Sequence, residues 1–265
     1  MAVKKSALDI EWRQFQKKEQ KFLETRAEKK DTFLNKKLAE KVPEKLQGTL
    51  DTAFAKAFGM IFAKGTSVIE KTYKKEELQK SFKVNEYADC VWQTRGSLRV
   101  FEKKAEKAGM RNMLMSGATG IGMGVFGVGI PDIALFVGFI LRSVYEIALD
   151  FGYEYESEAE RRFILMIIEG AVSYGEDLRR IDACINAFIE QNELPRDYSE
   201  KQQIARTAAG LSKELLYMKF LQGIPVVGAV GGAYDVVYLK KITEYANLKY
   251  KRRFLLKKKN ELIVG

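Results

Sequence analysis

Apolar residues recur every three or four positions along most of this 265-residue chain, which is the spacing of one face of an α-helix. A clear example runs in steps of four through Leu46, Leu50, Phe54, Phe58 and Phe62. Pro43 precedes this stretch and Gly65 follows it, and these residue types favour the start and the end of a helix. No segment alternates apolar and polar residues as a β-strand does, so the pattern predicts an all-α protein.

Charged residues dominate the two ends of the chain. Residues 6–41 carry apolar positions at helical spacing and predict an amphipathic helical arm that stops before Pro43. Residues 240–259 hold nine lysines and arginines and one carboxylate, and apolar residues there are again spaced by four. We therefore expect a charged amphipathic arm at 1–42, a helical core at 43–239 and a basic amphipathic C-terminal helix at 240–265.

Local chemistry predicts where several core helices begin and end. Pro131 is expected to begin a helix that runs to about Gly152. Ser157 and Glu160 form a capping box before an apolar run, and that helix is expected to break near Gly175. Ser199 with Gln202 is a second capping-box candidate.

Residues 117–141 read GATGIGMGVFGVGIPDIALFVGFIL and hold seven glycines. Gly120 and Gly124 lie four residues apart, and Gly228 and Gly232 repeat that spacing near a second Gly-Ile-Pro sequence. Glycines on one helix face let two backbones approach closely, so these four are candidate helix-packing glycines. We expect a helical bundle with two glycine-rich helix corners.

A glycine run can also form a nucleotide-binding loop or part of a membrane segment. Gly122, Gly124 and Gly127 match G-x-G-x-x-G, but a dinucleotide loop must follow a strand that opens a βαβ unit, and helix-rich sequence precedes them. Residues 113–141 lack basic charge, yet Pro131 and Asp132 interrupt them and leave only the nine residues 133–141 uninterrupted. A membrane span needs about 20. A buried hairpin and a shallow insertion in the bilayer both remain open.

The composition narrows the possible chemistry. The chain has no histidine, which excludes a Ser-His-Asp triad and a histidine-ligated metal, and its two cysteines cannot form a zinc site alone. No catalytic residue, cofactor or metal is therefore expected. The polar candidates for the core are Asp132, Arg142, Glu146 and Asp235. Arg142 and Glu146 lie four residues apart on one helix face, which predicts an ion pair.

The net charge of +10 indicates an anionic partner. In the C-terminal helix the candidate contacts to an anionic surface are Lys249, Lys251, Arg252, Arg253, Lys257, Lys258 and Lys259. A basic amphipathic helix is typical of membrane-surface contacts, whereas no recognition fold for nucleic acid accompanies the charge. The alternative is a helix whose apolar stripe packs on the core. The N-terminus lacks the apolar region of a secretory signal, so a cytoplasmic protein is expected.

Three stretches of the chain resemble the EcsC family of bacterial proteins. They are VPEKLQGTLDTAFAKAF, the glycine-rich run that continues to RRFILMII, and GIPVVGAVGGAYDVVYLKKITEYANLKYKRRF. The resemblance covers most of residues 40–254. The family is named for the third product of an operon that also encodes an ABC exporter, and no activity, cofactor or active-site residue comes with it. The resemblance thus implies a helical, cytoplasmic, membrane-associated accessory protein.

The leading functional expectation is a non-enzymatic protein at the cytoplasmic face of the membrane, with lipid or an ABC transporter as partner. The alternative is a soluble helical module that binds another protein. An enzyme with a carboxylate site around Asp132, Glu146 and Asp235 comes third.

Overall fold

The computed structural model describes residues 6–28, 44–64, 66–118, 131–191, 199–221 and 233–264. Within these ranges the secondary structure is α-helical and contains no β-strand, so the predicted all-α class is confirmed. The helices are α1 (Ala7–Glu24), α3 (Glu44–Lys64), α4 (Ser67–Glu70), α5 (Lys75–Trp92), α6 (Arg95–Ala118), α7 (Pro131–Asp150), α8 (Glu158–Ala171), α9 (Gly175–Gln191), α10 (Glu200–Leu221) and α11 (Ala233–Val264).

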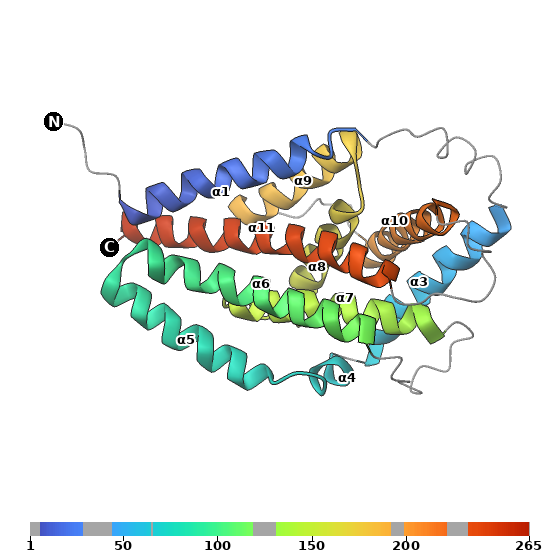
Figure 1. Cartoon of the computed structure of the whole chain (residues 1–265), viewed down its shortest axis with the longest axis horizontal. Helices are drawn as coiled ribbons and strands as arrows, with labels where there is room; N and C mark the ends of the chain where they lie inside the picture. The colour runs from blue at the N-terminus through green and yellow to red at the C-terminus, as the bar shows by residue number, and fades with distance from the viewer. Residues whose placement is uncertain are drawn as a thin grey trace.

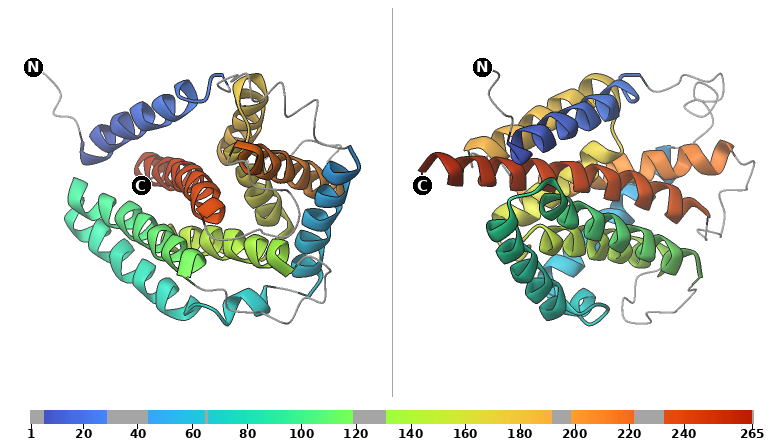
Figure 2. Two further views of the ribbon diagram at one scale, coloured as in Figure 1. Left: turned by 45° about the vertical axis from the view of Figure 1, so that its right-hand side comes forward. Right: turned by 60° about the vertical axis from the view of Figure 1, so that its left-hand side comes forward.

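The basic C-terminal segment lies in α11, a helix of 32 residues without glycine or proline that runs through the bundle (Figure 1). α1, α6, α7, α8 and α9 pack against it. α3 and α10 pack on each other at the end of the molecule away from the termini, and they contact α7 and α8 respectively (Figure 2). The expected boundary at residue 240 falls inside α11 and separates no packing units, because the same helix contacts the core on both sides of it.

The core is densest along α7. Side chains are buried around most of this helix, and its charged residues Arg142, Glu146 and Asp150 follow one another at intervals of four on one side. Ile133, Val137, Leu141 and Val144 are each at most 1% exposed. The segment 133–141 is therefore enclosed by protein. Residues 119–130 of the glycine run lie outside the described residues. None of the described helices is both long enough and apolar enough to cross a bilayer.

Several predicted helix ends are confirmed. α7 begins at Pro131, and its C-terminal turn leads to Gly152, whose φ of +82° favours glycine. The Ser157 hydroxyl accepts a hydrogen bond of 3.1 Å from the Glu160 N–H at the start of α8. Gly175, with φ of +59°, begins α9.

The predicted arm helix over 6–41 ends earlier than expected. α1 stops at Glu24, and the chain after it is tied to the corner between α8 and α9. The Arg26 guanidinium donates to the Ala171 carbonyl at 2.8 Å, and the Gly175 N–H donates to the Arg26 carbonyl at 2.9 Å. These bonds fix the turn. Residues 29–43 lie outside the described residues.

Candidate functional site

Lys249 was a candidate surface contact, but its side chain is fully buried between three helices. Its Nζ lies 2.7 Å from Glu19 Oε1 of α1 and 2.6 Å from Asp182 Oδ1 of α9. The Tyr245 hydroxyl, one turn earlier on α11, donates to the same Asp182 oxygen at 2.6 Å. Burial and the negative charge of Asp182 raise the pKa of Tyr245, so this hydroxyl stays protonated.

Lys251 and Arg252 are likewise paired with acids of other helices. Lys251 Nζ lies 2.8 Å from Glu11 of α1 and 2.7 Å from Glu102 of α6. Arg252 lies 2.7 Å from Glu19 and 2.6 Å from Glu190. α1 therefore docks on α11 through two buried acids, Glu11 and Glu19, beside its apolar stripe.

The remaining basic residues of α11 differ in exposure. Arg253 is partly buried and pairs with Glu160 at 2.7 Å. Lys258 is buried 3.4 Å from Asp89, and Lys259 is partly buried with its Nζ 4.9 Å from the centre of the Trp12 ring. Lys257 is half exposed.

The expectation of a solvent-facing basic stripe on α11 is therefore corrected. Lys249, Lys251 and Lys258 lie inside the bundle, and α11 buries side chains around most of its circumference. The physical reason is that carboxylates from α1, α5, α6, α8 and α9 converge on this helix. Buried charges require such partners, and the sequence of one helix does not show them.

The predicted ion pair between Arg142 and Glu146 is confirmed. The two side chains are buried, and Arg142 Nε lies 3.0 Å from Glu146 Oε1. Arg111 and Asn112 of α6 donate to the other oxygen of Glu146 at 2.8 and 3.0 Å. One turn further along α7, burial and the charge of Glu146 raise the pKa of Asp150 to about 7.

The other candidate side chains lie outside the described part of the structure. Asp132 and Asp235 belong to α7 and α11, but only their backbone is described. The candidate packing glycines Gly120, Gly124, Gly228 and Gly232 also lie outside the described residues. The glycine seam thus stays a prediction. Where side chains are described, no three acids or cysteines come together as a metal site.

The most unusual surface feature is the outer side of α5. Four large apolar residues point to solvent there: Val84 (68% exposed), Tyr87 (74%), Val91 (59%) and Trp92 (68%). We call this set the α5 face. Val84, Tyr87 and Val91 follow steps of three and four, so they form one line along the helix. A contiguous apolar stripe on a surface marks a site of contact with another apolar surface.

The exposed charges directly beside the α5 face are positive. Lys80 and Lys83 are exposed just before it, and no carboxylate is among the exposed positions of residues 78–97. One turn before Lys80, the exposed Glu76 carboxylate lies 4.0 Å from the Lys80 ammonium, so Lys83 is the cation nearest the face that has no such pair in the described structure. Asp89 points inward, where it accepts a hydrogen bond of 2.7 Å from the Ser97 hydroxyl. Glu86 is partly buried, with the Lys257 ammonium 3.7 Å away.

α11 extends this apolar surface at the same end of the molecule. The ends of α1, α5, α6 and α11 surround a cavity of about 240 Å³, which is lined by Cys90 of α5 and Leu262 of α11 among others. Leu262 is 65% exposed and Ile263 is 81% exposed. Within the described residues, six of the eight large apolar side chains that are exposed lie on α5 or on the last turn of α11. The last turn of α11 lies at the end of the molecule that holds both chain ends (Figure 1).

The α5 face was not predicted from the sequence, although a signal exists there. α5 carries apolar residues on two sides: Leu78 and Phe82 pack on the core, while Val84, Tyr87 and Val91 lie on the opposite side. A helix of a bundle needs one apolar face to fold. The second apolar face of α5 has no folding role within the described structure, so it is available for contact with another molecule.

Comparison with known proteins places the chain in a family without assigning an activity. No curated protein and no solved structure matches it. The family model described as the EcsC protein family matches residues 9–255, which span α1 to the last turns of α11. The match therefore includes the buried acids of α1 and the cations of α11 that pair with them. This chain belongs to the EcsC protein family.

Proposed function

We propose that this protein is a non-enzymatic, peripheral protein that attaches to an anionic membrane surface at the cytoplasmic face through the α5 face. The observation that carries the proposal is the exposed line of Val84, Tyr87, Val91 and Trp92, with Lys83 beside it and no exposed carboxylate among residues 78–97. Aromatic side chains favour the membrane–water interface, and lysines favour an anionic leaflet.

The expected magnitudes fit reversible attachment. Full burial of one large apolar side chain contributes about 1.5–3 kcal/mol, and an interface buries these side chains only in part. Each lysine near an anionic leaflet adds about 1 kcal/mol. The α5 face with Lys83 beside it therefore supports binding that responds to lipid charge and to salt. The basic residues inside α11 contribute little, because carboxylates already neutralise them.

Vesicle flotation tests this proposal. The full chain is expected to float with vesicles that contain anionic phospholipid and to float less with neutral vesicles. The triple variant Val84→Ser, Val91→Ser, Trp92→Ser should lose flotation while its circular dichroism stays unchanged, because these side chains are exposed. The double variant Met110→Ser, Val237→Ser removes exposed apolar residues elsewhere and should float like the original chain.

The competing function is a soluble helical module that binds a protein through the same face. It predicts no flotation of the original chain with vesicles of either composition. That result, or equal flotation of the triple variant and the original chain, contradicts membrane attachment through α5.

A further inference from the structure

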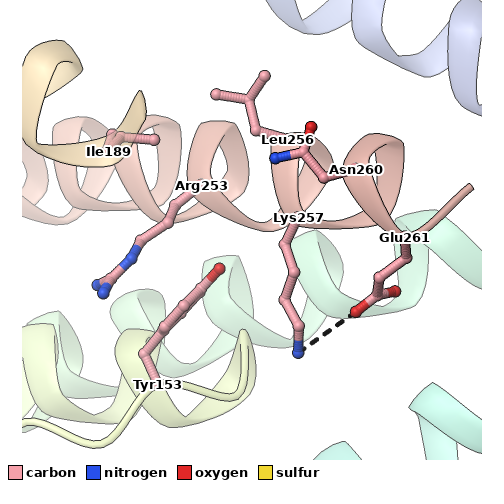
Figure 3. Close-up of a pocket in the computed structure, with 7 residues that line it drawn as sticks. All are labelled: Tyr153, Ile189, Arg253, Leu256, Lys257, Asn260 and Glu261. Carbon is pink, nitrogen blue, oxygen red and sulfur yellow. Dashed lines mark ion pairs between the residues drawn. The ribbon is translucent and has the colours of Figure 1, made fainter. Parts of the chain in front are cut away.

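A cleft of about 710 Å³ lies between the last turns of α11, the end of α9 and the chain that joins α7 to α8 (Figure 3). Ile189, Leu256 and the ring of Tyr153 give it apolar walls. The polar residues that line the cleft lie on one side of α11 at helical spacing; they are Arg253, Lys257, Asn260 and Glu261. The cleft is distinct from the α5 face.

Two polar groups of the cleft have no hydrogen-bond partner among the described residues. The Lys257 ammonium lies 3.7 Å from the Glu86 carboxylate and 3.8 Å from that of Glu261, which is too far for a hydrogen bond. The Tyr153 hydroxyl oxygen is buried and has no partner within the described part of the chain. Buried hydroxyl groups are nearly always paired in folded proteins, so this one points to a bound group that the protein itself does not supply.

The structure holds Tyr153 in this place. The Arg253 guanidinium lies 4.2 Å from the centre of the Tyr153 ring and pairs with Glu160 at 2.7 Å. Burial raises the pKa of Tyr153 above its ordinary value, so the hydroxyl remains protonated and can donate. Lys257, which has only two long ion pairs, and Tyr153 are therefore both donors without a hydrogen bond. The partner that suits them is an anion with several acceptor oxygens.

We propose that this cleft binds the phosphate group of an amphiphile, with the Lys257 ammonium and the Tyr153 hydroxyl as donors and the apolar chain against Ile189 and Leu256. Asn260, three residues beyond Lys257, supplies a further amide donor at the rim. The Tyr153 hydroxyl is covered in this structure, so binding requires side chains around it to move. The half-exposed Lys257 side chain must also exchange its ion pairs with Glu86 and Glu261, at 3.7 and 3.8 Å, for the phosphate.

Isothermal titration calorimetry of the full chain with soluble probes tests the inference separately from vesicle attachment. The probes are dihexanoyl phosphatidic acid below its micelle concentration, glycerol 3-phosphate and inorganic phosphate. The first carries both a phosphate and apolar chains, the second a phosphate ester alone and the third the free anion. We expect the lipid to bind about tenfold more tightly than the other two, because only the lipid uses the apolar walls.

Single variants identify the donors. Tyr153→Phe keeps the ring that stacks on Arg253 and removes only the hydroxyl, and it should weaken lipid binding about tenfold, as should Lys257→Gln. Glu261→Gln should strengthen binding, because it removes the carboxylate that lines the cleft. Lys259→Gln is the matched control, since Lys259 is a neighbouring cation that does not line the cleft. Its affinity should equal that of the original chain.

Three results would each overturn the inference. They are the absence of lipid binding, inorganic phosphate binding as tightly as the lipid, and a loss in Lys259→Gln as large as that in Lys257→Gln. The last result would mean non-specific attraction to the charge of α11. Thermal melts of each variant show whether a loss of binding comes from loss of fold.

Discussion

Lys249 of α11 and Glu19 of α1 are 230 residues apart in the chain, yet their Nζ and Oε1 atoms lie 2.7 Å from each other inside the bundle. Asp182 of α9 lies 2.6 Å from the same nitrogen, so one ammonium joins three helices. A buried pair of this kind adds little net stability compared with apolar residues of similar size. Breaking it is costly, because the remaining charge is left without a partner.

Lys249→Met should therefore destabilise the protein by about 3–5 kcal/mol, since it leaves the buried Asp182 without a cation, whereas Glu19 keeps Arg252. Urea unfolding followed by circular dichroism measures this. Lys257→Met makes the same chemical change at a half-exposed lysine and should cost less than about 0.5 kcal/mol.

A multiple variant separates charge from packing at this site. Asp182→Asn combined with Lys249→Met removes the uncompensated charge and should recover much of the lost stability. If Lys249→Met is as stable as the original chain, the three side chains do not form this buried cluster.

Acid should weaken the attachment of α1. Burial alone raises the pKa of Glu11, but the hydrogen bond and charge of Lys251, with Arg99, outweigh it and hold this pKa below the ordinary value of 4.5. A lowered carboxyl pKa contributes stability above pH 4.5, and this contribution is lost as pH falls through the folded-state pKa. Urea midpoints measured between pH 7 and pH 3 should fall at the acid end. In Glu11→Gln that fall should be smaller, and an unchanged slope contradicts the pairing.

Asp150 should change the stability with pH in the opposite direction to Glu11. Its pKa is raised to about 7, so the unfolded chain loses this proton at lower pH than the folded chain does. The group therefore reduces stability as pH rises from about 4 to about 7, by about 4 kcal/mol at most. Asp150→Asn should have little effect at pH 4 and should raise the melting temperature at pH 8. A stabilisation that does not depend on pH would show that Asp150 is ionised in the fold.

Gly152 should tolerate no side chain. Its φ of +82° is unfavourable for other residues, and an added Cβ would overlap the ring of Phe82. Gly152→Ala is expected to destabilise by more than about 1 kcal/mol. Gly48→Ala is the matched control in the exposed interior of α3, where nothing lies within 4 Å, and it should stabilise by up to about 1 kcal/mol. Differential scanning calorimetry of both variants compares them, and equal melting temperatures would contradict the argument.

The predictions that proved correct rest on residues close together in the chain. Pro131 begins α7 and Ser157 caps α8 because both roles depend on backbone chemistry within one turn. Arg142 and Glu146 meet because residues four apart lie on one side of a helix. The arm helix was predicted too long, since the turn after Glu24 depends on Ala171 and Gly175, far away in the chain.

By themselves, then, the amino acids determined the helical class, several helix ends, the family and the pair on α7. Which charged and apolar side chains face water was decided only by the folded bundle. Lys251 is paired with Glu11, 240 residues away, so its burial appears in no local pattern. In the same way Val84 and Tyr87 look like core residues until the packing leaves their side of α5 uncovered. Whether a side chain is buried depends on which residues of other helices pack against it. The sequence of a single helix therefore does not determine which of its side chains are buried.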